Sequence, residues 1–137
     1  MVVIDTSVAY KWFSTEKEGH LSQSLKLLEA HLHKKETIIA PNLIIYELAN
    51  AWSTKTKLSV EKIKTFLEDL KEIDIKIEPL TFGLISKTID FSKKYRVSVY
   101  DASYAVLAKE KKCDLITADS KFAEQVNLPF IKHLSKY

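Results

Sequence analysis

The chain is poor in the residues that break, cross-link or loosen a fold. Its 137 residues include only two glycines, three prolines and one cysteine. A single cysteine cannot form an internal disulfide, and Cys113 opens an apolar segment, where a small buried hydrophobe is the simpler interpretation than a reactive thiol. So little glycine and proline leaves no linker or low-complexity stretch, and we expect one domain over residues 1–137.

Three further features that the sequence lacks limit the cellular location and the chemistry that can be expected of the protein. No apolar run approaches the roughly 20 residues that span a bilayer, and no charged leader precedes the first apolar segment, so we expect a cytoplasmic protein. No glycine-rich phosphate loop is present, which argues against the common nucleotide-binding folds. His31 and His33 do not share a helix face, and His20 and His133 have no partner by spacing, so we expect surface histidines and no zinc pair.

The composition that remains is that of a globular protein. Hydrophobic residues make up 46% of the chain and charged residues 28%. The formal net charge is +3, and the sequence pI is near 8.8. This mildly basic balance permits a nucleic-acid partner without establishing one.

Short β-branched apolar segments alternate with amphipathic ones. The pattern predicts strands at residues 2–4, 37–40, 73–77, 114–117 and 129–131. It predicts helices at residues 8–13, 16–34, 41–56, 60–71, 82–95, 99–112 and 120–126. In the helix at 16–34, an apolar face is expected from the spacing of Leu21, Leu25, Leu28 and Leu32. This alternation indicates parallel βαβ units in a three-layer α/β/α sandwich with a central parallel sheet.

Four acidic residues fall near the carboxyl ends of these strands. Asp5 follows the first strand and Asp119 follows the fourth, so the two meet if those strands are neighbours where the strand order reverses. Asp101 opens the helix that leads into the fourth strand. Glu47 lies about two turns into the helix after the second strand, from where its long side chain can reach the same edge.

Each acid also has a purely structural interpretation. Asp5 and Asp119 are good helix caps, Ser98 and Asp101 form a capping box, and Glu47 fits a solvated helix face. These interpretations do not predict that the acids converge. Four carboxylates brought together repel one another unless cations neutralise them. Oxygen ligands without nearby His or Cys favour Mg²⁺ or Mn²⁺ over Zn²⁺.

The segments around the acids resemble the motifs of PIN-domain ribonucleases, and most closely those of VapC toxins from toxin–antitoxin pairs. The four segments stand in the family's order: VIDTSVAYKWF, PNLIIYELANAW, YDASYAVLA and LITADSKF. The resemblance implies a parallel sheet with strand order 3-2-1-4-5, which places Asp5 beside Asp119.

The resemblance also implies an activity. The expected protein is a metal-dependent endoribonuclease, acting as the toxin of a toxin–antitoxin pair and leaving 5′-phosphate and 3′-hydroxyl ends. One or two Mg²⁺ or Mn²⁺ ions are expected, bound by Asp5, Glu47, Asp101 and Asp119. The hydroxyls expected to orient carboxylates or water belong to Thr6, Ser7 and Thr117. RNA-backbone contacts are expected from Lys11, Lys93, Lys94, Arg96 and Lys121. The implied partners are RNA, a cognate antitoxin and a second copy of the chain.

Alternatives stay open from the residues alone. The same fold can act as a non-catalytic module that binds RNA or protein, or as a PIN nuclease of RNA processing rather than a toxin. Phosphoryl transfer to a protein carboxylate needs a second acid beside the first, or D-x-D, whereas Asp5 is followed by Thr6 and Ser7. The sequence does not name the RNA target.

Overall fold

The centre of the fold is a five-stranded parallel sheet. The computed structural model describes residues 1–14 and 19–137. Its strands lie in the order β3-β2-β1-β4-β5. Their bounds are β1 (Val2–Ile4), β2 (Ile38–Pro41), β3 (Lys76–Glu78), β4 (Asp114–Thr117) and β5 (Ile131–His133). The predicted α/β fold and the predicted strand order are both confirmed.

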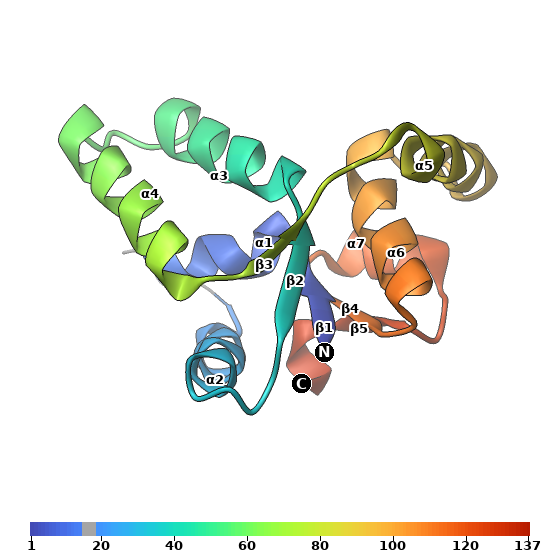
Figure 1. Ribbon diagram of the computed structural model, residues 1–137, viewed down its shortest axis with the longest axis horizontal. Coiled ribbons are helices and arrows are strands. Elements are labelled where there is room, and N and C mark those ends of the chain that lie inside the picture. Colours follow the sequence, from blue (N-terminus) through green and yellow to red (C-terminus); the bar gives the residue numbers. More distant parts are fainter. Residues whose placement is uncertain (15–18) are drawn as a thin grey trace.

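Helices cover both faces of the sheet. In chain order they are α1 (Thr6–Ala9), the 3₁₀ helix η1 (Tyr10–Phe13), α2 (Leu21–Leu32), α3 (Leu43–Thr54), α4 (Val60–Ile73), α5 (Phe82–Tyr95), α6 (Val99–Lys111), α7 (Ser120–Val126) and the 3₁₀ helix η2 (Leu134–Lys136). Figure 1 shows α2, α3 and α4 on one side of β2, and α5 and α6 on the other. None of the helices in the described ranges combines the length and the apolar character that a membrane crossing requires.

Helix α6 lies directly on the sheet. Every residue from Ala102 to Ala108 is buried, and the helix contacts β1, β2 and β4. Small alanine side chains allow this close approach, and the strands beneath offer fully buried branched residues such as Val3, Ile39 and Leu115. The first turn of α6 is therefore held firmly at one edge of the central strands.

The strand order reverses between β1 and β4. These two strands pair in parallel, with Ile4 opposite Ile116. Continuing that register by one residue brings Asp5 level with Thr117, both at carboxyl ends. In open α/β sheets such a reversal leaves a crevice beyond the strand ends, where ligands bind.

Some predicted boundaries are wrong. Pro41 ends β2 instead of opening the next helix, and Ile73 still belongs to α4, so the edge strand β3 begins only at Lys76. The last strand is Ile131–His133 rather than residues 129–131. Pro129 has no backbone N–H to give to a sheet, which favours a start beyond it. The predicted start of a helix at residue 16 lies outside the described residues.

The buried face of α2 also differs from the prediction. Leu25 and Leu32 are 43% and 54% exposed, whereas Leu27 and Ser24 are fully buried. The Ser24 hydroxyl donates to the Val8 carbonyl (3.1 Å), and the Trp12 indole donates to the Ser24 carbonyl (3.0 Å). These polar contacts turn the Ser24 side of α2 toward η1, and a count of leucines alone does not detect them.

Candidate functional site

Asp5 joins the end of β1 to the start of α1. Its side chain is only 9% exposed and caps α1 by accepting the Ser7 backbone N–H (3.0 Å). The Ser7 hydroxyl donates to the same oxygen, Oδ1, and the Thr117 hydroxyl donates to Oδ2. The oxygen–oxygen distance is 2.5 Å in both hydrogen bonds. Both carboxylate oxygens are thus held by hydroxyl donors from two adjacent strand ends.

The same two hydroxyls also hold the loop that carries Asp119. Ser7 Oγ accepts the Ala118 N–H (2.8 Å), and Thr117 Oγ1 accepts the Asp119 N–H (3.0 Å). Asp119 itself caps α7, because its Oδ1 accepts the Phe122 N–H (3.0 Å). The two hydroxyls therefore link Asp5 to the loop that carries Asp119, and each of these acids is also a helix cap.

Asp101 lies in the first turn of α6 and is half-buried. Ser98 caps this helix by accepting the Asp101 N–H at Oγ (3.0 Å), which is one half of the predicted capping box. This bond uses the backbone of Asp101, and hydrogen bonding to the Ser98 side chain also lowers the pKa of the Asp101 carboxyl, against the larger effect of burial, which raises it.

The fourth acid, Glu47, is held by two hydroxyls. It lies in the second turn of α3, and its Oε1 accepts the Thr6 hydroxyl (3.1 Å) and the Tyr104 hydroxyl (2.5 Å). Thr6 Oγ1 and Tyr104 OH are themselves 2.9 Å apart. The sequence did not lead us to Tyr104, although it stands three residues after Asp101, the spacing that places two side chains on one helix face.

The carboxylates influence one another electrostatically. Burial raises the pKa of Asp5 from 3.8 to about 6, the bonds from Ser7 and Thr117 lower it, and the charge of Asp101 raises it. Burial also raises the pKa of Asp101, and the charges of Asp119 and Glu47 raise it further. Asp101 is thus coupled to all three other acids. Burial and the bond to Glu47 raise the pKa of Tyr104 above its usual range, so its hydroxyl stays protonated.

This arrangement is not a preformed metal cage. Among residues 1–14 and 19–137, no three His, Cys, Asp or Glu side chains converge closely enough to hold an ion as they stand. The donor chemistry nevertheless suits a hard divalent cation, because the site offers carboxylate oxygens whose mutual repulsion such an ion relieves. Direct binding of one ion by three of these carboxylates would require them to lie closer together than they do here.

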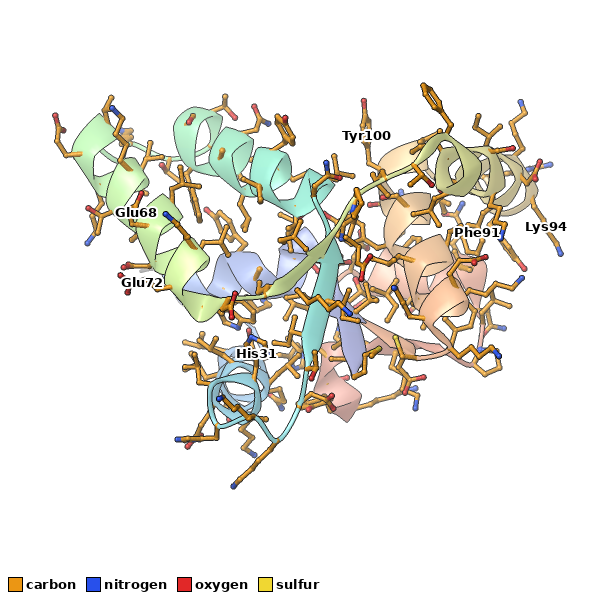
Figure 2. All side chains as sticks on the ribbon, viewed as in Figure 1. His31, Glu68, Glu72, Phe91, Lys94 and Tyr100 are labelled. Carbon is orange, nitrogen blue, oxygen red and sulfur yellow. The ribbon has the colours of Figure 1, made fainter. Side chains whose placement is uncertain are left out.

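The basic residues that were expected to contact RNA differ in their solvent exposure. Lys11 is only 8% exposed, so it presents little charge to a phosphate backbone. The other four are exposed: Lys93, Lys94, Arg96 and Lys121. Figure 2 shows Lys94 projecting outward from α5, where its ammonium lies 5.4 Å from the ring centre of Tyr95.

Two histidines that the sequence left without partners meet in the structure. The rings of His20 and His133 lie 5.2 Å apart, centre to centre. His133 Nε2 is 3.1 Å from Ser120 Oγ and 3.3 Å from the Ala118 carbonyl oxygen. Through these contacts His133 holds β5 against the loop that carries Asp119, so we assign the pair a structural role.

Comparison with known proteins agrees with the fold. The model of the family described as PIN domain matches residues 2–127. Among curated proteins, no relative matches the sequence. Solved structures match over nearly the whole chain but at low identity, and such identities establish a likeness of fold alone.

Three of these structures show how close the likeness is. FitAcB from Neisseria gonorrhoeae is 15% identical with a TM-score of 0.69, and 100% of each chain is covered. A toxin–antitoxin complex from Klebsiella pneumoniae is 14% identical with a TM-score of 0.74, covering 98% of each chain. The sarcin–ricin-loop-cleaving toxin VapC20 from Mycobacterium tuberculosis is 12% identical with a TM-score of 0.69, covering 90% of this chain and 94% of that one.

Proposed function

This chain belongs to the PIN-domain family, and we propose that it is a metal-dependent endoribonuclease that hydrolyses RNA phosphodiester bonds. Members of the family are typically nucleases. The observation that carries the proposal is the coupling of Asp101 to Asp5, Glu47 and Asp119 at the reversal of the sheet. Capping and a solvated helix face account for each acid separately, but they do not explain why the charge of Asp101 is coupled to those of the three other acids.

The proposed roles follow from the contacts of each residue. Asp5, Glu47, Asp101 and Asp119 would hold Mg²⁺ or Mn²⁺, as one or two ions. A bound ion supplies an activated water and neutralises charge that develops on the phosphate. Ser7 and Thr117 fix the direction of the Asp5 carboxylate, while Thr6 bonds Glu47. The exposed cations Arg96 and Lys121 stand close in sequence to Asp101 and Asp119, where they can contact the RNA backbone.

We further propose that the nuclease is the toxin of a toxin–antitoxin pair, with a cognate antitoxin and a second copy of itself as partners. The support is the likeness of fold to the Klebsiella pneumoniae toxin–antitoxin complex and to the toxin from Mycobacterium tuberculosis. A test is to induce the chain in cells with and without the product of any short neighbouring reading frame. Growth arrest that this product relieves is expected, whereas unaffected growth would place the nuclease in RNA processing instead.

The nuclease activity is tested with purified protein, RNA and Mg²⁺ or Mn²⁺. Wild type should cut and leave 5′-phosphate and 3′-hydroxyl ends, and Asp101→Asn should lose the activity. Asp90→Asn is the matched control, since Asp90 is an exposed acid on α5 outside the site. Equal cutting by wild type and Asp101→Asn would identify a contaminating nuclease and remove the basis of the proposal.

The competing function is a binding module that keeps the fold without catalysis. It shares the acids but has no need for a metal. Calorimetric titration with Mn²⁺ separates the two, because the nuclease requires saturable binding that Asp101→Asn weakens. Tight RNA binding without either Mn²⁺ binding or cleavage would favour the module.

A further inference from the structure

Tyr104 is the one aromatic residue in the buried stretch of α6 from Ala102 to Ala108. It is 1% exposed, so its hydroxyl must find partners inside the protein. Those partners lie on two other elements: Glu47 on α3 at 2.5 Å and Thr6 on α1 at 2.9 Å. One phenol thus connects three helices at the edge of the acid cluster.

The three contacts share only two protons. Thr6 and Tyr104 carry one hydroxyl proton each, and an ionised Glu47 carries none. Both hydroxyls can donate to Glu47 Oε1, or Thr6 can donate to Tyr104 while Tyr104 donates to Glu47. Tyr104 can also donate to Thr6 while Thr6 donates to Glu47. The distance to Glu47 Oε1 is 2.5 Å from Tyr104 and 3.1 Å from Thr6, which favours the arrangements in which Tyr104 donates to the carboxylate. A hydrogen bond to an ionised acceptor is also roughly twice as strong as a neutral one.

This bond fixes one oxygen of Glu47 and leaves the other available. Within the described residues, no hydrogen bond reaches Glu47 Oε2. Glu47 is only partly buried, so without an anchor its flexible side chain can turn toward solvent. Asp101 lies on the same helix as Tyr104, three residues earlier, and is electrostatically coupled to Glu47. Helix α6 therefore carries Asp101 and also sets the position of Glu47 relative to it.

We infer that Tyr104 is a positioning residue, whose buried hydroxyl holds Glu47 Oε1 so that Oε2 faces the Asp101 side of the site, ready for a divalent cation. The inference rests on the proposed metal site, although not on RNA as the substrate. Hydroxyl partners behind metal ligands matter in general: their removal typically weakens metal affinity or activity about 10- to 100-fold.

The test measures Mn²⁺ binding by calorimetry, without RNA. Tyr104→Phe keeps the buried ring and removes only the hydroxyl, and it should weaken Mn²⁺ binding by about 10-fold or more. Tyr100→Phe is the matched control, because Tyr100 is 62% exposed on the same helix and projects away from the protein (Figure 2). The control should bind Mn²⁺ like wild type. Equal affinity in Tyr104→Phe and wild type would overturn the inference, as would a wild type that binds no Mn²⁺.

A second comparison separates positioning from general destabilisation. If Tyr104 acts through Glu47, then adding Tyr104→Phe to a Glu47→Gln variant should cause no further loss of Mn²⁺ affinity. A further loss of the same size in that background would show that Tyr104 acts by another route and would overturn the inference. Should Tyr104→Phe not fold, Thr6→Val is measured against Glu47→Gln in the same way, with a smaller loss expected.

The result is distinguishable from failure of the proposed function. A protein that binds Mn²⁺ through Glu47 and Tyr104 but cuts no RNA would refute the ribonuclease and leave the positioning role intact. If instead the Tyr104→Phe variant cuts RNA and binds Mn²⁺ as well as wild type does, the positioning role is refuted and the ribonuclease proposal stands.

Discussion

The Thr117 hydroxyl donates a 2.5 Å hydrogen bond to Asp5 Oδ2 across neighbouring parallel strands, between residues 112 positions apart in the chain. The same oxygen of Thr117 accepts the Asp119 N–H. One fully buried hydroxyl therefore fixes the direction of one acid and the backbone of another. The centre of the site is built from strand ends that the sheet topology brings together.

Replacing Thr117 with valine should destabilise the protein although the shape is preserved. Thr117→Val leaves Asp5 without one donor and the Asp119 N–H without its acceptor. An unsatisfied buried group costs about 1–3 kcal/mol, so a loss of roughly 2 kcal/mol or more is expected in urea denaturation. Thr65→Val is the control: its hydroxyl bonds a helix carbonyl on exposed α4, and the change should stay within about 0.5 kcal/mol.

Asp5→Asn should stabilise the metal-free protein near neutral pH. Burial raises the pKa of Asp5 from 3.8 in the unfolded chain to about 6 in the fold. Below pH 3.8 both states are protonated and there is no penalty. As the pH rises to about 6 the unfolded state ionises first, so wild type loses up to roughly 3 kcal/mol. The variant avoids this loss.

The measurement is urea denaturation of both proteins from about pH 2.5 to about pH 8 with a chelator present. The series then begins about one unit below the unfolded pKa of 3.8 and ends about two units above the folded pKa of about 6. The stability difference should be near zero at the acid end and grow until about pH 6. A pH-independent difference, or a variant less stable than wild type at pH 7, would show that Asp5 is not the strained buried acid that its surroundings indicate.

The features of the fold that depend on the spacing of apolar residues and on short motifs could be predicted from the sequence. Alternation of apolar segments predicted the α/β fold, and the resemblance predicted the strand order that the structure confirms. Asp5, Asp101 and Asp119 could be named because each follows a strand or opens a helix. Glu47 could be named because its long side chain, about two turns into a helix, can reach the same edge of the sheet. Their roles in metal binding stay predictions, since the structure brings the carboxylates into electrostatic contact without closing them around an ion.

What the sequence missed depends on three-dimensional contacts. Tyr104 was not singled out from the sequence, because only the fold shows that its hydroxyl reaches Glu47. Lys11 was expected to contact the RNA backbone because it stands beside an acidic motif, yet it is buried in η1. The face of α2 was mispredicted because Ser24, a polar residue, is its fully buried contact. Buried polar side chains that hydrogen-bond within the protein cannot be recognised from the spacing of hydrophobic residues.

The scarcity of glycine has a cost at the helix ends. In the described part of the chain, four helices end on a residue in the left-handed region that is not glycine: Asp74, Arg96, Lys112 and Asn127. Lys112, with φ 53°, is exposed, so Lys112→Gly should stabilise the protein. Glycine removes about 1–2 kcal/mol of backbone strain from the folded state. It also raises the conformational entropy of the unfolded chain, which lowers the free energy of unfolding by roughly 0.5–1 kcal/mol. Thermal and urea unfolding should show a net gain, whereas Lys109→Gly, inside the same helix, should lose about 1 kcal/mol.

RNA binding should depend on Arg96 and Lys121, the exposed cations nearest in sequence to Asp101 and Asp119. Each phosphate contact to a single strand contributes a slope of about −0.7 to the plot of log affinity against log salt. Replacing both cations with glutamine in an Asp101→Asn background, which leaves the RNA intact, should reduce that slope by roughly 1.4. Lys64→Gln, on exposed α4, controls for net charge and should change the slope little. An unchanged slope in the double variant would mean that the RNA follows another surface, since loss of a phosphate contact must release fewer counterions.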